Sequence, residues 1–380
     1  MSAEPARRQI RLGLLTNPPG NGARGQVRPG DVRHTGRVLD HYADLARTAE
    51  ASKFDVLFAA DGLTSDTEVG TKPEPLTLFS ALAAVTERIG LVPTVSTTFT
   101  APFNLARQLQ SLDHLSGGRV GWNAVTSAAG ERNFGDAPLP EHEAQHHPVL
   151  FQAGSSDDGK AFAAAFAEGV YTAQQTLRGA QSFYRDLKAR TAAAGRNPAN
   201  ILVLPGISTT IGGTEEEAKR IDDDLFEQHY SDASRTALEG QLSGVDLSGL
   251  ALDDAIPPSW LPPVVSVQGR QSRYGVFREL AVDEGWTVRQ LITLQQRSAG
   301  HGRAVGSPEQ VANRLERWFV DGGADGFIVM PGQGPGGVEA FTEHVVPILQ
   351  KCGLFRTDYE SDTLRGNLGL PAIPERALAA

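Results

Sequence analysis

The sequence predicts a (β/α)8 barrel, and two observations support this fold class. First, helix-like segments alternate with short apolar runs almost to the end of the chain, which is typical of a parallel sheet with crossover helices. Second, about seven or eight such runs lie between residues 9 and 330, which matches the length and rhythm of a barrel. The strand-like runs occupy 9–16, 54–61, 89–97, 119–126, 148–153, 169–172, 201–208 and 326–330.

A doubly wound parallel sheet is the alternative fold. The first run is followed by Asn17-Pro-Pro-Gly-Asn-Gly22, and a dinucleotide-binding sheet would have Gly-x-Gly-x-x-Gly opening a helix at this point. The Pro- and Gly-rich stretch 17–34 is longer than an ordinary connection and is therefore a candidate lid. The barrel is the better prediction.

The helices are predicted from apolar stripes and capping residues. Residues 39–51 carry apolar side chains at helical spacing, and Ser or Asp can cap the helix that follows residue 159. The Pro-rich stretch 256–263 is expected to be a surface insertion. Helices are predicted at 39–51, 75–88, 102–115, 160–168, 176–194, 214–230 and 308–321.

The chain is expected to form one barrel domain over residues 1–355, followed by a tail at 356–380. No low-complexity linker divides the first part. The tail reads as polar and loop-like, so it is expected to wrap around the body of the protein or a neighbouring subunit.

Composition excludes several classes of function. A formal net charge of −10 argues against nucleic acid or an anionic membrane as the main partner, and no apolar run approaches the ~20 residues that span a bilayer. The single cysteine, Cys352, leaves no internal disulfide framework and too few thiolates for a zinc or iron–sulfur site. The N-terminus lacks the apolar core of a signal peptide. We expect a cytoplasmic protein that acts on a small molecule.

Polar side chains follow the predicted strands at the end where barrel enzymes place their sites. Asp61 ends the second run, Thr97 and Thr98 follow the third, and Asn123 lies within the fourth. Asp61 can also be a turn-forming residue, and Asn123 can belong to a core network or contact a ligand. Hydroxyl and amide groups can hydrogen-bond the edge of a heteroaromatic ring, whereas the paired carboxylates of a hydrolase are not visible.

Ser155 and Ser156 follow the fifth run and directly precede a predicted helix. The free N–H groups at the helix N-terminus and the two hydroxyls form a good cradle for a phosphate. A plain helix cap is an equally good interpretation.

Several His and Arg residues are further candidates for a site. The cluster of His142, His146 and His147 has poor spacing for metal ligands and is expected to be a solvated loop, so no metal is predicted. His301 is expected to have a surface or capping role. Three arginines are candidates for recognition of an anionic substrate, although exposed positions on helices are the better expectation for Arg178, Arg273 and Arg297.

Taken together, these stretches resemble the bacterial luciferase-like superfamily, and within it the branch of nitrilotriacetate and dibenzothiophene sulfone monooxygenases. The resemblance covers most of the chain. It rests on 53–61 (KFDVLFAAD), 74–77 (EPLT), 86–91 (TERIGL), 111–127 (SLDHLSGGRVGWNAVTS), 133–135 (NFG), 152–156 (QAGSS) and 305–308 (VGSP).

The resemblance implies a luciferase-like barrel with insertions that is the oxygenase of a two-component system. Such an enzyme takes reduced FMN from a separate NAD(P)H-dependent FMN reductase and uses O2 to oxygenate a small organic substrate, and it forms a homodimer or homotetramer. Trp122 is expected to be a wall of the flavin pocket, and His142 and Asn123 are the candidate catalytic residues. The implied FMN-binding residues are Asp61, Thr97, Thr98, Asn123, His142, Ser155 and Ser156.

The chain departs from the family pattern between the fourth and fifth runs. Only 21 residues separate Thr126 from Pro148, and they do not read as a helix, although a parallel crossover normally contains one. We therefore predict that a segment is missing between Gln145 and His146, either deleted in this protein or absent from the sequence.

Two other functions remain open at this point. One is an F420- or NAD(P)H-linked flavin oxidoreductase of the same superfamily. The other is a non-catalytic flavin-binding protein, which the short link between the fourth and fifth runs keeps under consideration.

Overall fold

The computed structural model describes residues 8–16, 38–61, 73–98, 100–125, 147–267, 271–298, 300–330 and 337–373. The strands within these ranges pair in parallel, and eight of them close into a barrel in the order β1-β2-β3-β4-β5-β6-β7-β9, with β9 pairing back to β1. The strands are β1 (Arg11–Leu15), β2 (Val56–Ala59), β3 (Gly90–Ser96), β4 (Gly121–Val125), β5 (Val149–Ala153), β6 (Gly169–Thr172), β7 (Leu202–Ile211), β8 (Gly302–Gly306) and β9 (Gly326–Met330).

The predicted (β/α)8 barrel is confirmed, because all eight predicted runs are barrel strands. The sequence did not predict β8, which pairs with the second half of β7 from Ile207 to Ile211. That strand contains two glycines and an arginine among its five residues, so it carries little apolar signal.

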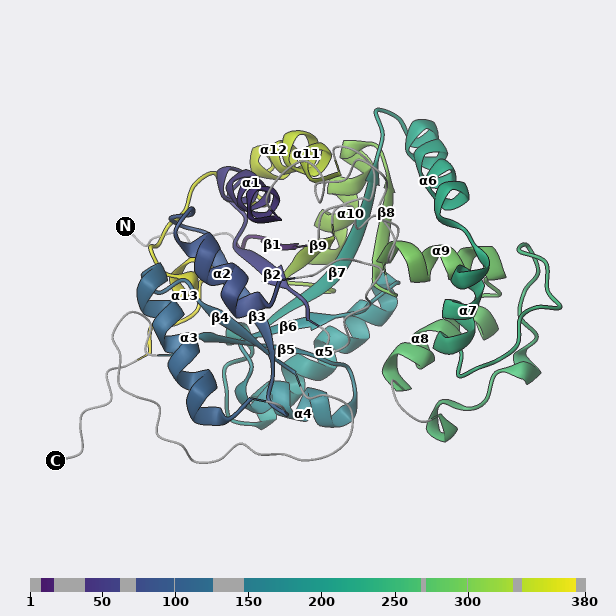
Figure 1. The fold of residues 1–380 in the computed structure, drawn as a ribbon, viewed down its shortest axis with the longest axis horizontal. Coiled ribbons are helices and arrows are strands. Elements are labelled where there is room, and N and C mark those ends of the chain that lie inside the picture. Colours follow the sequence, from purple (N-terminus) through teal and green to yellow (C-terminus); the bar gives the residue numbers. More distant parts are fainter. Residues whose placement is uncertain are drawn as a thin grey trace.

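Helices cover the outside of the barrel, as Figure 1 shows for α1, α2, α3 and α10. Those that follow a barrel strand in the chain are α1 (Val38–Ala51), α2 (Pro75–Ala83), α3 (Pro102–Ser116), α4 (Asp157–Phe166), α5 (Leu177–Ala193) and α6 (Glu215–His229), whereas α10 (Pro308–Val320) follows β8. The remaining helices are α7 (Asp232–Gln241), α8 (Gln271–Val282), α9 (Val288–Ser298), α11 (Gly337–Ala340), α12 (Val346–Lys351) and α13 (Leu364–Asn367).

Alternation along each strand separates two apolar layers. Val56 and Phe58 of β2 belong to the cluster inside the barrel, whereas Leu57 and Ala59 pack in the layer between the barrel and the helices. Inside, the Phe58 ring lies 6.2 Å from that of Phe151 and 5.2 Å from that of Tyr171, measured between centroids. Aromatic side chains therefore fill much of the barrel interior.

The part of the chain between β7 and β8 in sequence forms a second hydrophobic core. Helices α7, α8 and α9 stand beside the barrel in Figure 1 and enclose a cluster of their own, which includes Leu238, Tyr274 and Leu291. The stretch 256–263 joins this cluster, because Ile256 is 1% exposed and Leu261 is 3% exposed. The expectation that this stretch is only a surface insertion is therefore wrong for these two side chains. Each of them adds apolar area to the core of the helical body.

The amino-terminal end of the barrel, called the base below, is closed by the C-terminal part of the chain. Leu364, Leu368 and Leu370 join the apolar cluster inside the barrel. Two buried arginines of the same segment pair with carboxylates that directly precede strands: Arg356 with Asp55 at 2.6 Å, and Arg365 with Glu168 in a two-point contact. The division into residues 1–355 and 356–380 stays a prediction.

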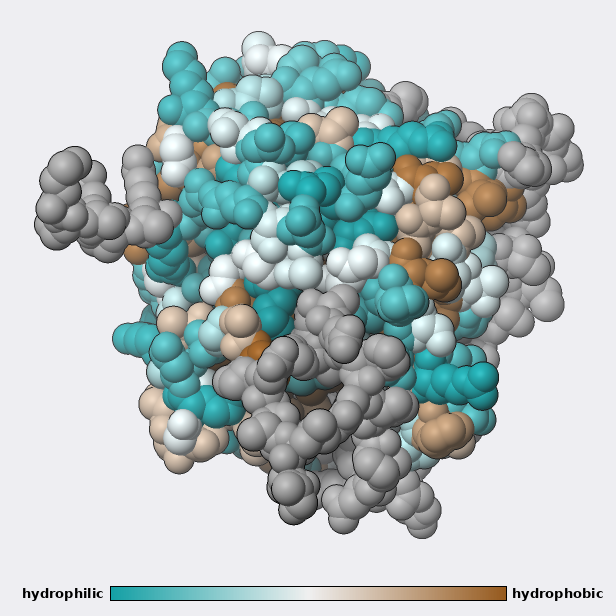
Figure 2. Space-filling view, turned by 90° about the vertical axis from the view of Figure 1, so that its left-hand side faces the viewer, coloured by the Kyte–Doolittle hydropathy of each residue, from teal (hydrophilic) through white to brown (hydrophobic). Residues whose placement is uncertain are grey.

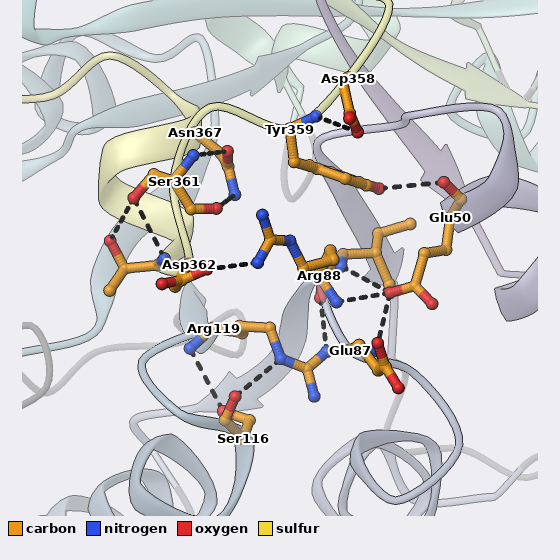
Figure 3. Close-up of polar contacts among 12 residues, drawn as sticks. Glu50, Glu87, Arg88, Ser116, Arg119, Asp358, Tyr359, Ser361, Asp362 and Asn367 are labelled. Atoms are coloured by element: carbon orange, nitrogen blue, oxygen red, sulfur yellow. Dashed lines mark hydrogen bonds and ion pairs between the residues drawn. The ribbon is translucent and has the colours of Figure 1, made fainter.

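Polar contacts bind neighbouring loops together at the base (Figure 3). The Glu50 carboxylate accepts hydrogen bonds from the backbone N–H groups of Glu87, Arg88 and Ile89, at 2.6–2.9 Å. Arg119 is buried and donates to the carbonyl oxygens of Ser116 and Ile89. Burial lowers the pKa of this guanidinium from its ordinary value. These contacts fix the loops that lead into β3 and β4.

The outer surface is mainly hydrophilic on the face that Figure 2 shows, with separate hydrophobic areas. Every helix in the described ranges is too short or too polar to cross a membrane. The predicted lid at 17–34 and the residues around the predicted missing segment, 126–146, lie outside these ranges.

Candidate functional site

The carboxyl ends of four neighbouring strands, β2 to β5, carry the predicted site residues that the structure describes. These strands pair in sequence order, so their ends form one continuous stretch of the barrel edge. Asp61 lies two residues after β2 and is exposed. The other described candidates on this edge are Thr97, Thr98, Asn123, Ser155 and Ser156. His142 lies outside the described residues.

Asn123 provides the most informative side chain on this edge. It is 3% exposed, it lies opposite Thr94 in the register of β3 and β4, and its Nδ2 donates to Thr94 Oγ1 at 2.8 Å. Its Oδ1 is buried and has no hydrogen-bond partner among the described residues. Buried amide atoms almost always have a partner, so this oxygen is suited to accept a hydrogen bond from a bound molecule.

The two threonines continue the edge next to Asn123. Thr97 donates from its backbone N–H to the carbonyl oxygen of Val125 at 2.9 Å, and its hydroxyl lies 3.3 Å from the same oxygen. Thr98 is exposed, and its backbone N–H donates to Ser96 Oγ. Pairing beyond the regular ladder therefore keeps β3 and β4 together up to their last residues.

Trp122 does not share the side of β4 that Asn123 occupies. Its ring packs against the apolar layer between the barrel and the helices, and its Nε1 donates to the carbonyl oxygen of Val95 at 3.3 Å. The expectation that Trp122 is a wall of the same pocket as Asn123 is therefore wrong. Alternation explains the difference, because neighbouring residues of a strand point to opposite faces.

Ser156 is the N-cap of α4, and its Oγ accepts a hydrogen bond from the Gly159 backbone N–H at 3.1 Å. The helix-cap interpretation of this serine is thus realised. Its hydroxyl proton can still be donated, since capping uses only a lone pair. Ser155 is half-buried next to it.

One of the two acidic side chains in the first turn of α4, that of Asp157, is paired with cations. Asp157 lies 3.2 Å from Lys160 Nζ and 2.9 Å from Arg190 Nη2, and hydrogen bonding to Lys160 is the main cause of its lowered pKa. Lys160 also pairs with Asp186 at 2.7 Å. The negative charge of Asp157 is therefore compensated, and the helix dipole at this end favours an anion.

Sequence reasoning missed a buried Tyr–His pair in the upper half of the barrel. The Tyr171 and His301 rings stack at 4.6 Å, and the Tyr171 hydroxyl lies 3.0 Å from His301 Nε2. His301 Nδ1 lies 3.2 Å from the carbonyl oxygen of Thr172 and must donate to it, so Nε2 is the acceptor for the tyrosine. Burial lowers the pKa of His301 to about 3 and raises that of Tyr171, so both side chains are neutral near pH 7.

The expected surface role of His301 is wrong, since the residue is 6% exposed. The expectation of an exposed arginine is correct for Arg178 and wrong for Arg297, which is 5% exposed, while Arg273 is half-buried. A signal for His301 was present in the sequence, because it directly precedes the five-residue strand β8. The weak apolar character of that strand concealed it.

A closed parallel barrel with polar side chains gathered at the carboxyl ends of its strands is the arrangement of a (β/α)8 enzyme. Comparison with known proteins narrows this class. The family model described as luciferase-like monooxygenase matches residues 25–141 and 128–326, and the chain belongs to this family.

The chain is 36% identical to N-acetyl-S-(2-succino)cysteine monooxygenase of Bacillus subtilis (strain 168), over 96% of this chain and 97% of the relative. It is 35% identical to nitrilotriacetate monooxygenase component A of Aminobacter aminovorans, over 98% and 99% of the two chains. A crystal structure of a riboflavin lyase with modified FMN and its substrate riboflavin has a TM-score of 0.76 at 25% identity, covering 96% of each chain. The predicted family is confirmed.

These matches also bear on the predicted missing segment. The alignment with the Bacillus relative has 431 positions and this chain has 380 residues, so at least 51 of those positions are gaps in this chain. The two segments of the family match overlap at residues 128–141, which lie between β4 and β5 in the sequence. Where the gaps fall along the chain stays a prediction.

Proposed function

We propose that this protein is the FMNH2-dependent oxygenase of a two-component monooxygenase, and that its flavin lies across the carboxyl ends of β2 to β5. The observation that carries the proposal is the buried Oδ1 of Asn123, which has no hydrogen-bond partner among the described residues. A reduced isoalloxazine ring carries N–H donors, and one of them can give this oxygen the hydrogen bond that it lacks. The named relatives are monooxygenases, and one of them is a component A.

The residues present fit both ends of FMN. Asn123 and the Thr97–Thr98 pair would hold the ring, with Asp61 at its edge, and Ser155 and Ser156 would hold the phosphate at the N-terminus of α4. When bound, reduced FMN supplies the electrons that let O2 give one oxygen atom to a substrate and the other to water. Asn123 and His142 are the proposed residues nearest the reacting part of the ring.

The barrel interior contributes by excluding water. Phe58 and Phe151 are fully buried below the edge, so the ring would lie above an apolar floor. The described residues contain no group of three or more His, Cys, Asp or Glu side chains that could hold a metal ion. The chain's own task is therefore to bind, orient and shield the flavin and the substrate.

The remaining parts of the proposal concern partners and location. A separate NAD(P)H:FMN reductase would supply the reduced flavin, and a small organic molecule would be the substrate. We propose that the protein is cytoplasmic, because a reducing compartment suits a chain with one cysteine. We also propose that it forms a homodimer or homotetramer.

The first test is an anaerobic titration of the purified protein with photoreduced FMN, followed by mixing with oxygenated buffer. Saturable binding, and reoxidation of the flavin through a transient absorbance that free FMNH2 does not give, would support the proposal. A variant with Asn104→Ala, an exposed residue of α3, is the control and should behave as the unmodified protein.

Other outcomes separate the alternative functions. Saturable binding of FMN that persists in air without oxygen-dependent product would favour a non-catalytic flavin-binding protein. Turnover with reduced F420 but not with FMNH2 would favour the F420-linked oxidoreductase. Failure to bind any reduced flavin would refute the proposed function.

A further inference from the structure

The side chain of Gln152 has no role in the fold that the described contacts reveal. Gln152 is the fourth residue of β5, and its neighbours Phe151 and Ala153 face the apolar interior of the barrel. Alternation places the Gln152 side chain on the opposite face, beneath the loop that leads to α4. It is 8% exposed, and its Oε1 has no hydrogen-bond partner among the described residues.

The amide is directed into the turn between Gly154 and Gly159. A Cβ atom added at Gly154 would lie 2.7 Å from Gln152 Nε2 but 3.9 Å from Oε1, so the nitrogen is the closer end of the amide. A Cβ added at Gly159 would lie 3.3 Å from the same nitrogen and 3.1 Å from Ser156 Oγ. The amide nitrogen and the capping hydroxyl therefore approach the same small space at the start of α4.

The two glycines are explained by this approach and not by backbone conformation. Neither Gly154 nor Gly159 is among the described glycines with positive φ, so the backbone at both positions suits other residues. What a side chain would disturb at Gly154 is the Gln152 amide. Because Gly154 has no Cβ, the amide nitrogen of Gln152 has room to approach the turn.

We propose that Gln152 Nε2 is an inner donor to the phosphate bound at the N-terminus of α4, beside Ser155 and Ser156, and that it makes the chain select FMN over riboflavin. This inference rests on the proposed function. The α4 N-terminus supplies the dipole and backbone N–H groups, and Ser156 supplies a hydroxyl. A neutral amide adds a donor without another cation, which suits a helix whose neighbouring cations, Lys160 and Arg190, already pair with carboxylates.

The test compares two ligands that differ only in the phosphate. Photoreduced FMN and photoreduced riboflavin are titrated anaerobically into the unmodified protein and into variants with Gln152→Met and Gln152→Glu, and protein fluorescence gives the dissociation constants. Loss of one hydrogen bond to a charged phosphate should weaken FMN about tenfold or more in Gln152→Met. The isosteric carboxylate of Gln152→Glu should weaken FMN further. Riboflavin binding should stay the same in both variants.

Matched variants separate this role from packing. Gln108→Glu, at an exposed position of α3, introduces the same charge change and should leave both affinities unchanged. Gly154→Ala should reproduce the selective loss of FMN, because the new methyl group displaces the amide. Equal weakening of both flavins by the Gln152 variants would assign Gln152 a packing role and overturn the inference.

The unmodified protein gives an independent measurement if a variant does not fold. Inorganic phosphate should compete with reduced FMN and leave riboflavin binding unchanged. Equal affinity for the two flavins would overturn the inference together with the proposed phosphate site and leave the proposed oxygenase activity intact, whereas binding of neither flavin would refute the proposed function itself.

Discussion

The two ends of the barrel are built on different principles. At the base, three carboxylates that directly precede a strand each have a cation: Asp55 pairs with Arg356, Glu168 with Arg365, and Asp325 with Lys188. At the carboxyl edge, the buried groups of β4 and β5 are neutral amides whose oxygens, Asn123 Oδ1 and Gln152 Oε1, have no partner among the described residues. The base satisfies charge within the chain, and the carboxyl edge retains hydrogen-bonding capacity for a ligand.

This difference separates stability from function within one fold. Buried ion pairs destabilise strongly when one partner is removed, so the base is a place where substitutions unfold the protein. Unpartnered amides cost stability until a ligand binds them. A few arginine nitrogens at the base, such as Arg356 Nε, also have no hydrogen-bond partner within the described ranges, but their guanidinium groups lie beside a carboxylate of opposite charge. The two ends of the barrel therefore differ in whether their buried groups are charged and in whether those groups have an opposite charge beside them.

Removal of the C-terminal segment should have the largest effect. A chain that ends at Phe355 loses the leucines at 364, 368 and 370, each worth about 1.5–3 kcal/mol of burial, and leaves Asp55 and Glu168 without their arginines. We expect loss of cooperative thermal unfolding, measured by circular dichroism. Removal of residues 374–380 alone is the control. A cooperative unfolding transition in the chain that ends at Phe355 would contradict the conclusion that the base stabilises the fold.

The substitution Asp55→Ala tests the base at one residue. It leaves the guanidinium of Arg356 buried without its carboxylate and removes the acceptor of the Leu12 N–H, so the free energy of unfolding should fall by about 3–5 kcal/mol. Urea denaturation measures this. The folded variant should bind reduced FMN as before, and a selective loss of FMN binding would break the proposed separation of the two ends.

His301 makes stability depend on pH in the upper half of the barrel. Its folded pKa of about 3 is below the ordinary 6.5, because burial and the Arg273 guanidinium disfavour the cation. Between these values the unfolded chain binds more protons, so stability falls as pH falls, by about 2–3 kcal/mol from pH 6 to pH 4. Urea denaturation at several pH values should show that the free energy of unfolding depends less steeply on pH in His301→Gln than in the unmodified chain. An equal dependence of the free energy of unfolding on pH in the two proteins would contradict a neutral, buried histidine.

The substitution Asn123→Ala should have the smallest effect on folding. It removes a buried acceptor that has no partner in the described part of the chain, together with the donor to Thr94, so the free energy of unfolding should change by less than about 1.5 kcal/mol. Reduced FMN should bind about tenfold more weakly, measured by anaerobic titration with Asn104→Ala as control. A large loss of stability with unchanged FMN affinity would make Asn123 a structural residue.

The sequence by itself determined the fold and the family. Eight apolar runs predicted the barrel strands, since buried parallel strands are short and continuously apolar, and the motifs around 53–61 and 111–127 identified the luciferase-like family. It also placed Asn123 and Ser156 on one edge, because parallel strands share the direction of their carboxyl ends.

Only the tertiary structure decided which of these groups have partners. Burial of His301, the orientation of Trp122 away from Asn123, and the closure of the base by residues 356–370 depend on contacts between segments far apart in the chain. A sequence pattern gives the face of a strand or helix, but hydrogen bonding depends on what the fold brings opposite each atom. For that reason the role proposed for Gln152, which reads in the sequence as one polar residue in an apolar strand, came from the structure.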